Sequence, residues 1–288
     1  MFTLPRLDRI TQGTIFCGGV AEGYDGKPVW GVVITARCDA VHDKTPIINY
    51  LPLVRVEDWL SRNGGLLAIE KALSDTLAGF KNMLTHRSLS HSLMEVYPLS
   101  ELAAVHFPEV SAPYASKKEE KEAQLALNAR RLAADFEILE SCQSARIPDA
   151  VKRAVRTHRK VIHTLAENLV GQKIAGYYYV PDIGGLTDHQ SALGYVIHLR
   201  EVRYIGRMTA NVLAKGLSRE DSIDRKITEL AFDAFDFAFP VSELVSPWIE
   251  HLMQTFCSLF GRIGVTDIDK SLAALISGAV APDCEENV

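Results

Sequence analysis

A cluster of ionisable residues follows directly after an apolar run. The run Gly31-Val-Val-Ile-Thr35 leads into Cys38, Asp39, His42 and Lys44. Ionisable groups at the end of a strand lie in loops that a scaffold holds in place, and catalytic groups concentrate in such loops. A thiolate near a cation is an activated nucleophile, and a histidine can accept its proton. These four residues are therefore candidate catalytic residues.

Two other interpretations of this loop remain open. Cys38 and His42 could ligate a metal ion, and Asp39 could bond its own backbone in a purely structural loop. The sequence holds no P-loop, no paired-glycine dinucleotide fingerprint and no His-x-x-x-His helix. We therefore expect no cofactor, and we assign no metal site.

A basic strip is the second feature that could support a function. The predicted helix over 148–169 gathers basic residues on one face through its 3.6-residue period, and these residues are Lys152, Arg156, Arg159 and Lys160. Such a strip can contact phosphates without reading a base sequence. A solvated face that forms salt bridges with the acidic helix before it explains the same pattern.

Aromatic and ionisable residues also meet in two later strands. The run Tyr177 to Tyr179 and the nearby Arg200 and Arg203 could form a stacking platform for unpaired bases, or the tyrosines could simply pack in a core. Alternation places His198 on the polar face of its strand. This histidine could face a pocket beside Glu201, or it could be a hydrogen-bonded, partly buried residue.

The apolar pattern predicts the elements that hold these residues. Strands are expected over 13–17, 29–35, 46–54, 174–180 and 194–205, and Pro52 would place the third strand at an edge or a bulge. Helical spacing is found over 66–84, 117–140, 148–169, 208–217 and 247–263. The second and third of these helices are expected to form an antiparallel hairpin inserted between strands.

The order of these strands resembles that of the MazF/PemK-like toxins, which are small SH3-like barrels that cut single-stranded RNA. The resemblance is carried by Gln12-Gly13-Thr-Ile-Phe16 and by Gly26-Lys27-Pro28 leading into Gly31-Val-Val-Ile-Thr35. It covers about the first sixty residues and 174–217. Lys27 stands where the family has its catalytic arginine, so the resemblance implies that Lys27 contacts nucleic acid. Leu51-Pro52-Leu53-Val54 replaces the segment that carries the family's strand-end hydroxyl.

These observations predict an α+β protein built on a five-stranded SH3-like (MazF-like) β-barrel. The two halves of the barrel would occupy 1–62 and 173–217. An inserted helical hairpin subdomain would occupy 63–172, and a C-terminal helical cap and tail would occupy 218–288.

Composition limits the choice of function. The 288 residues carry a formal net charge of −5, which argues against extensive wrapping of nucleic acid, and both signs of charge are interspersed. The five cysteines are scattered without a Cys-x-x-Cys pair, which is typical of a reducing compartment. The start of the chain lacks the apolar core of a signal peptide, and no apolar run is long enough to cross a bilayer. We expect a cytoplasmic protein without a membrane partner.

The sequence therefore predicts a bacterial nucleic-acid-associated protein of toxin or phage-defence type that binds single-stranded nucleic acid, with RNA cleavage implied by the resemblance. The alternative is a non-catalytic interaction module. In that case the helix that begins near Trp248 would dock a protein partner or a second copy of the chain, because its surface is apolar around much of its circumference.

Overall fold

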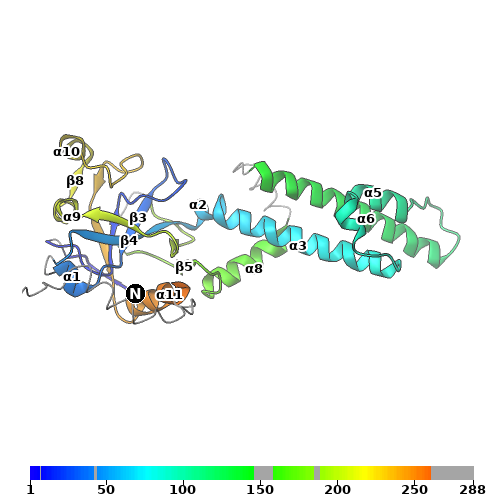
Figure 1. The fold of residues 1–288 in the computed structure, drawn as a ribbon, viewed down its shortest axis with the longest axis horizontal. Helices are drawn as coiled ribbons and strands as arrows, with labels where there is room; N and C mark the ends of the chain where they lie inside the picture. The colour runs from blue at the N-terminus through cyan, green and yellow to red at the C-terminus, as the bar shows by residue number, and fades with distance from the viewer. Residues whose placement is uncertain (7, 42–43, 146–157, 185–188, 261–288) are drawn as a thin grey trace, which may run out of the picture.

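The computed structural model describes the whole chain except residues 7, 42–43, 146–157, 185–188 and 261–288. Two parts lie end to end along the longest axis of the molecule (Figure 1). One is a sheet part with helices on its faces. The other is an arm made of helices that follow residue 62, and it extends away from the sheet. The α+β class predicted from the sequence is confirmed.

The main sheet is antiparallel and curls into a half-barrel. Its strand order is β1-β10-β2-β3-β4-β6-β5, and β7 pairs separately with β4. These strands are β1 (Phe2–Thr3), β2 (Thr14–Cys17), β3 (Val29–Val33), β4 (Ile47–Arg55), β5 (Tyr177–Val180), β6 (Tyr195–His198), β7 (Arg203–Gly206) and β10 (Pro240–Leu244). The sheet thus has eight strands rather than the five expected.

The long strand β4 lies against β3 on one side and against two shorter strands on the other. β7 pairs with residues 47–50 of β4 and β6 pairs with residues 53–55. Pro52 falls in the gap between these two pairings, opposite Gly31 of β3. A proline has no N–H to donate, so this gap accommodates it within the sheet. The expectation that Pro52 would put this strand at an edge or a bulge is wrong, because β4 has strands on both sides and a continuous register with β3.

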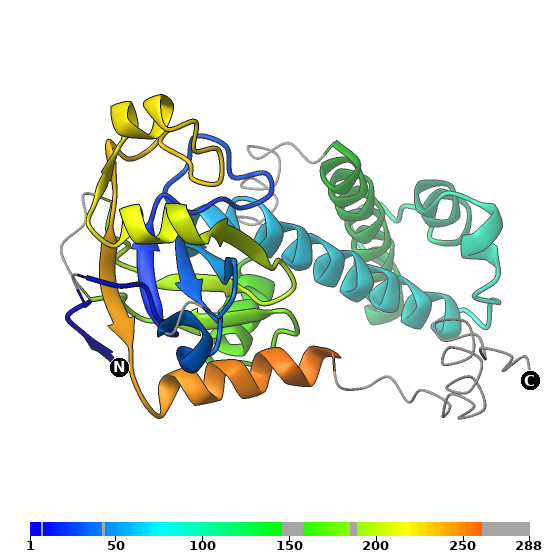
Figure 2. The ribbon, with the colours of Figure 1, turned by 60° about the vertical axis from the view of Figure 1, so that its left-hand side comes forward.

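Apolar clusters cover both faces of the sheet. On one face, Trp30 packs in an edge-to-face arrangement with Tyr195, and helix α11 (Trp248–Phe260) buries Ile249 and Leu252 against the cluster. Figure 2 shows α11 running beneath the sheet. On the other face, Phe16 and Tyr50 pack with residues of α9 (Arg207–Leu213). The helix predicted near Trp248 is confirmed.

Over its described residues, 218–260, the segment that the sequence suggested as a helical cap contains strands as well as helices. It contains β8 (Leu217–Ser218), α10 (Arg219–Asp224), β9 (Phe237–Ala238) and β10, and β10 joins the main sheet between β1 and β2. Sequence reasoning missed β10 because it is short and holds Ser242 and Glu243, which do not look like interior residues. Both are buried: Ser242 is 1% exposed and Glu243 is 5% exposed.

The arm is organised around helix α3 (Asn63–His86). Both α6 (Lys117–Ala145) and α8 (Arg159–Val170) pack on α3, and α4 (Leu93–Val96) and α5 (Leu99–His106) lie near its far end. The predicted helices over 66–84 and 117–140 are confirmed. The predicted start of the next helix, Pro148, lies outside the described residues. The helices α6 and α8 were expected to pair with each other as a hairpin. In the structure both pack on α3.

The arm joins the sheet through α2 (Val56–Leu60), which follows β4 directly. Trp59 of α2 is fully buried and packs edge-to-face on Tyr177 of β5. Helix α1 (Arg37–Val41) lies at the opposite end of the sheet part, away from the arm (Figure 1). Among the helices that the structure describes, none has the length and apolar character needed to cross a membrane.

Candidate functional site

The described part of the predicted catalytic loop includes helix α1, which carries Cys38 and Asp39. Cys38 is exposed, and its thiol donates to Asp39 Oδ1 at 3.4 Å. The Arg207 guanidinium donates to the carbonyl oxygens of Asp39, Ala40 and Thr45, so this loop is tied to the start of α9. Lys44 is exposed, and its backbone N–H donates to the Asp39 carbonyl. His42 lies outside the described residues, so a catalytic role for the loop stays a prediction.

The predicted basic strip is described only at its end. Arg159 and Lys160 occupy the first turn of α8 and are exposed, whereas Lys152 and Arg156 fall outside the described residues. The structure therefore shows two of the four cations on a solvated surface of the arm. Binding of nucleic acid by this strip also stays a prediction.

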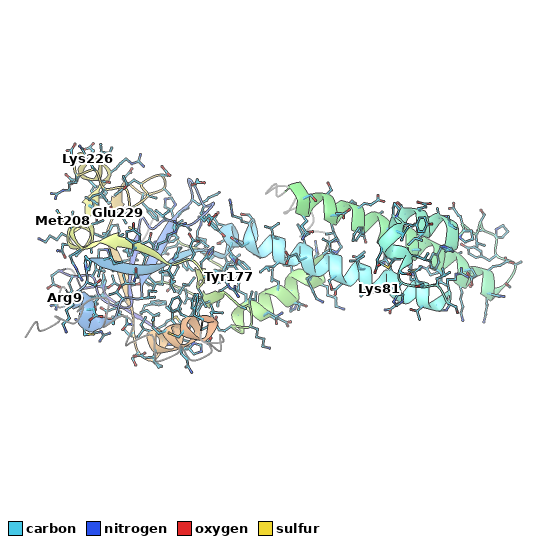
Figure 3. All side chains as sticks on the ribbon, in the orientation of Figure 1. Arg9, Lys81, Tyr177, Met208, Lys226 and Glu229 are labelled. Carbon is cyan, nitrogen blue, oxygen red and sulfur yellow. The ribbon has the colours of Figure 1, made fainter. Side chains whose placement is uncertain are left out.

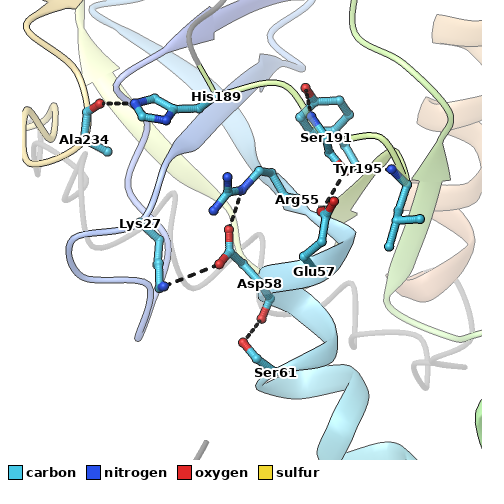
Figure 4. A network of polar contacts seen from close by, with 10 residues as sticks. Lys27, Arg55, Glu57, Asp58, Ser61, His189, Ser191, Tyr195 and Ala234 are labelled. Carbon is cyan, nitrogen blue, oxygen red and sulfur yellow. Dashed lines mark hydrogen bonds and ion pairs between the residues drawn. The ribbon is translucent and has the colours of Figure 1, made fainter. Parts of the chain in front are cut away.

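Lys27 belongs to a charge network at the start of α2 (Figure 4). Its ammonium lies 3.6 Å from Asp58 Oδ1, and Arg55 donates to the other oxygen of the same carboxylate at 2.6 Å. The Asp58 side chain is only 8% exposed. In the same region, Ser191 donates a hydrogen bond to Glu57 at 2.7 Å. Lys27 thus already faces a carboxylate, which weakens its expected role as a phosphate ligand.

A pocket of about 550 Å³ lies at the junction of the sheet and the arm. We call it the junction pocket. Its lining comes from the loop between β2 and β3, the turn between α2 and α3, strand β5 and the end of β6. The lining residues are Glu22, Ser61, Arg62, Asn63, Leu66, Gly176, Tyr177, His198, Arg200 and Glu201. Tyr177 marks this junction in Figure 3.

His198 is the buried titratable residue of the junction pocket. It is 6% exposed and forms T-shaped contacts with two tyrosine rings, with centroid distances of 5.4 Å to Tyr24 and 5.3 Å to Tyr177. Its Nδ1 atom is 3.5 Å from Glu201 Oε2. Within the described part of the chain, its Nε2 atom has no hydrogen-bond partner. A buried polar atom without a partner costs about 1–3 kcal/mol.

Glu201 is held in one orientation by donors to a single oxygen. Its Oε1 accepts from the Glu22 backbone N–H at 2.7 Å and from Arg203 at 2.6 and 2.8 Å, which leaves Oε2 facing His198. Burial raises the pKa of Glu201, but the contacts with His198, Arg203 and the Glu22 N–H outweigh it and lower the pKa below its usual 4.5. The group is therefore a carboxylate at neutral pH, aimed at the imidazole.

Two arginines supply positive charge to the junction pocket. The Arg62 guanidinium lies 5.6 Å from the centroid of the Tyr24 ring, a cation–π contact. The Arg200 side chain runs alongside Gly176, where a Cβ atom would lie 2.9 Å from its Nε. Neither arginine forms an ion pair with a carboxylate among the described residues.

The start of helix α3 adds to this positive character. Asn63, its first residue, lines the junction pocket, no side chain caps the helix, and no acidic residue occupies its first turn. The N-terminal end of a helix carries a partial positive charge, so it favours an anion nearby. A ligand with both a negative charge and a flat ring would match this pocket.

Sequence reasoning identified part of this site. It placed His198 beside Glu201 and grouped Tyr177 with Arg200, and the structure brings all four into one pocket. It missed Arg62, Asn63 and Glu22. No local signal marks these three as pocket residues, because they come from segments that meet only when α2 and the loop between β2 and β3 pack against β6.

Comparisons with known proteins give no relative for this chain. No family model, no curated protein and no solved structure matches it.

Proposed function

We propose that this chain is a bacterial nucleic-acid-associated protein of toxin or defence type that binds single-stranded nucleic acid in the junction pocket. The observation that carries the proposal is the presence of two arginines, Arg62 and Arg200, beside Tyr177 in one pocket, neither of which forms an ion pair with a carboxylate that the structure describes. Guanidinium groups bind phosphates, and aromatic side chains stack with unpaired bases.

The charge balance supports a phosphate ligand. Two carboxylates, Glu22 and Glu201, also line the pocket, but Arg203 neutralises Glu201 and Glu22 is exposed to solvent. Arg62 and Arg200 therefore remain available, with the start of α3 beside them. A pocket of about 550 Å³ falls within the usual range for small-ligand sites and can hold a nucleotide unit.

The fold and the compartment belong to the same proposal. The proposal includes an origin of the sheet in an SH3-like barrel of the MazF-like kind, and the curled antiparallel half-barrel supports this part of it. The described cysteines, Cys17, Cys38, Cys142 and Cys257, are unpaired, which fits a reducing cytoplasm. The exposed Arg159 and Lys160 would provide a second, weaker contact along the arm.

The test is a titration of labelled single-stranded RNA, single-stranded DNA and duplex DNA, followed by fluorescence anisotropy at several salt concentrations. The double variant Arg62→Gln, Arg200→Gln should bind single strands more weakly. Its slope of log Kd against log salt should fall by about 1.4, because each neutralised phosphate of a single strand contributes about 0.7. The matched control is Lys118→Gln, Arg131→Gln, which removes the same charge from exposed positions on α6.

Equal binding by the two double variants would contradict the proposal, and so would binding that does not respond to salt. If Arg159→Gln, Lys160→Gln weakens binding more than the pocket variant does, the arm rather than the junction pocket is the main nucleic-acid surface.

A second candidate function is a protein-interaction module that uses α11. Trp248 and Phe260, at the two ends of this helix, are 40% and 53% exposed. Exposed aromatic side chains are typical anchors at protein interfaces. Trp248→Ser would then shift a concentration-dependent oligomer toward monomer in size-exclusion chromatography with light scattering. A monomer at every concentration would argue against self-association.

A further inference from the structure

We infer that the junction pocket binds a phosphomonoester, the doubly charged phosphate at the end of a nucleotide strand, in preference to a phosphodiester within the strand. This inference rests on the proposed function, since it requires that single strands bind in the pocket. It adds a preference for chain ends, which goes beyond the binding of single strands in general.

The first support is the placement of two guanidinium groups at the pocket. Arg62 lies against the Tyr24 ring and so close to Gly23 that a Cβ atom there would overlap its guanidinium. The Arg200 side chain lies against Gly176, where a Cβ atom would be 2.9 Å from its Nε. Neither arginine forms an ion pair with a carboxylate in the described part of the chain. Both cations are therefore available to one ligand.

The start of helix α3 supplies a second kind of donor. Its N-cap residue is Arg62, whose side chain has no acceptor, and the Asn63 side-chain oxygen already accepts from the Tyr24 hydroxyl at 2.7 Å. Among the residues described, the N–H groups of Asn63, Gly64 and Gly65 have no acceptor. Such N–H groups point back along the helix axis, toward Arg62 and Asn63, which line the pocket. Phosphate oxygens are acceptors that suit this position.

The charge of the pocket matches a doubly charged ligand. A phosphomonoester carries a charge of about −1.5 to −2 at neutral pH, whereas a phosphodiester carries a single negative charge. Glu201 is paired with Arg203, and Glu22 is exposed to solvent. Even with Glu22 counted, the two arginines and the start of α3 provide more positive charge than one phosphodiester neutralises. A terminal phosphate therefore uses the pocket more fully.

The size of the pocket also favours a chain end. A volume of about 550 Å³ holds about one nucleotide unit. Its lining comes from four segments, and Tyr177 offers a ring to the terminal base in the same space. A phosphate within a strand needs an exit for the chain on both of its sides, whereas a terminal phosphate needs only one.

The experiment measures the affinity of the full chain for strands that differ only at their ends. The probes are internally labelled single-stranded RNA and DNA of one sequence, with a 5′-phosphate, a 3′-phosphate or hydroxyl groups at both ends. In fluorescence anisotropy, we expect a phosphorylated end to improve binding at least about tenfold, the gain from one hydrogen bond between charged groups. Unlabelled nucleoside monophosphate is the competitor that distinguishes a free nucleotide from a strand end.

Two variants place the effect in the pocket. Arg62→Gln, Arg200→Gln should bind all the strands with similar affinity, whereas the control Lys118→Gln, Arg131→Gln should keep the preference for a phosphorylated end. Arg62→Asp keeps the test conclusive if the glutamine variant fails to fold, because aspartate is a favoured N-cap residue and its carboxylate would occupy the start of α3. It should abolish the preference while the far-UV circular dichroism stays that of the unaltered protein.

The outcomes separate the two proposals. Equal affinity of the unaltered protein for phosphorylated and hydroxyl-ended strands overturns the inference and leaves the proposed function standing. A preference that persists in Arg62→Asp also overturns the inference, because the phosphate then binds elsewhere. Binding of nucleoside monophosphate without binding of any strand overturns the proposed function and identifies a free nucleotide as the source of the phosphate.

Discussion

At the scale of single residues, Glu201 connects three segments of the sheet part. Its carboxylate accepts hydrogen bonds from the loop between β2 and β3 and from Arg203 at the start of β7, and it faces His198 at the end of β6. These contacts lower the pKa of Glu201 even though burial raises it. The charged form is therefore bound more strongly in the folded state than in the unfolded chain, which links stability to pH.

The first prediction concerns this pH dependence. A carboxylate with a lowered pKa stabilises the fold above its unfolded value, and this contribution is lost as the pH falls through the lower folded value. Glu201→Gln should therefore reduce the free energy of unfolding at neutral pH, and the difference from the unaltered protein should shrink as the pH falls below 4.5. Urea unfolding at neutral pH and below pH 4.5 measures this difference in the free energy of unfolding. A difference that stays constant with pH would show that the charge of Glu201 does not contribute to stability.

The second prediction concerns the buried carboxylate of Asp58. Its ion pair with Arg55 has an N–O distance of 2.6 Å, and its side chain is 8% exposed. Asp58→Asn should lower the free energy of unfolding by about 1–3 kcal/mol, since it weakens charged hydrogen bonds in a buried site. The control Asp75→Asn breaks an exposed i,i+4 pair with Lys71 and should cost less than about 0.5 kcal/mol. Equal losses in urea unfolding would contradict the account of Asp58.

At the scale of elements, the turn between α2 and α3 sets how the arm leaves the sheet. Trp59 is buried under the first turn of α3, and its ring occupies the space where a side chain at Gly64 would begin. Glycine is therefore required there by close packing. The same turn brings Arg62 and Asn63 to the junction pocket, so its geometry also shapes the site.

A matched pair of glycine substitutions in α3 tests this explanation. In Gly64→Ala the new methyl group would overlap the Trp59 ring, so we expect a loss of about 1–3 kcal/mol in the free energy of unfolding. In Gly79→Ala the methyl group would meet Leu132 of α6 at 3.4 Å, an ordinary contact, and helix propensity should stabilise the protein by about 0.5–1 kcal/mol. Thermal or urea unfolding should therefore show shifts of opposite sign. Shifts of the same sign and size would contradict the packing argument.

The edge of the sheet at β5 is covered by a side chain. Gln172 accepts a hydrogen bond from the Tyr179 N–H at 3.0 Å and donates one to the Tyr179 carbonyl at 2.7 Å. The amide thus takes the place of a neighbouring strand. Covering the backbone groups of an edge strand in this way prevents pairing with another chain.

The prediction for this edge concerns hydrogen exchange. Gln172→Ala should speed amide exchange at Tyr179 about fivefold, which corresponds to the loss of about 1 kcal/mol of local stability. Exchange measured by NMR or mass spectrometry checks it. Gln124→Ala, which removes an exposed contact with Asn128 on α6, should leave Tyr179 unaffected. An unchanged exchange rate at Tyr179 in Gln172→Ala would show that water hydrogen-bonds the Tyr179 backbone as well as the glutamine does.

At the scale of the whole molecule, the sequence predicts local elements better than their pairing. The continuous apolar run of β3, the amphipathic spacing of α3 and the proline before Trp248 are local signals, and each matches an element of the structure. By contrast, β10 pairs with β2 across more than two hundred residues of chain. Periodicity carries no information about such a partner, so the extra strands were not predicted.

The same limit applies to predicting the site from the sequence. Alternation along one strand placed His198 on a polar face next to Glu201, which is local information. The pocket around them needs α2 and the loop between β2 and β3 to pack nearby, and that arrangement comes from the tertiary structure. The strongest local cluster, which begins at Cys38, lies instead at the end of the sheet part that faces away from the arm (Figure 1).

The most direct test of the central claim locates a bound strand on the protein. Single-stranded RNA that carries 4-thiouridine is crosslinked to the full chain by light, and the modified peptides are identified by mass spectrometry. The account predicts crosslinks in peptides that contain Arg62 or Tyr177, which line the junction pocket. Crosslinks confined to the peptide around Cys38, or to the arm at Arg159 and Lys160, would contradict it.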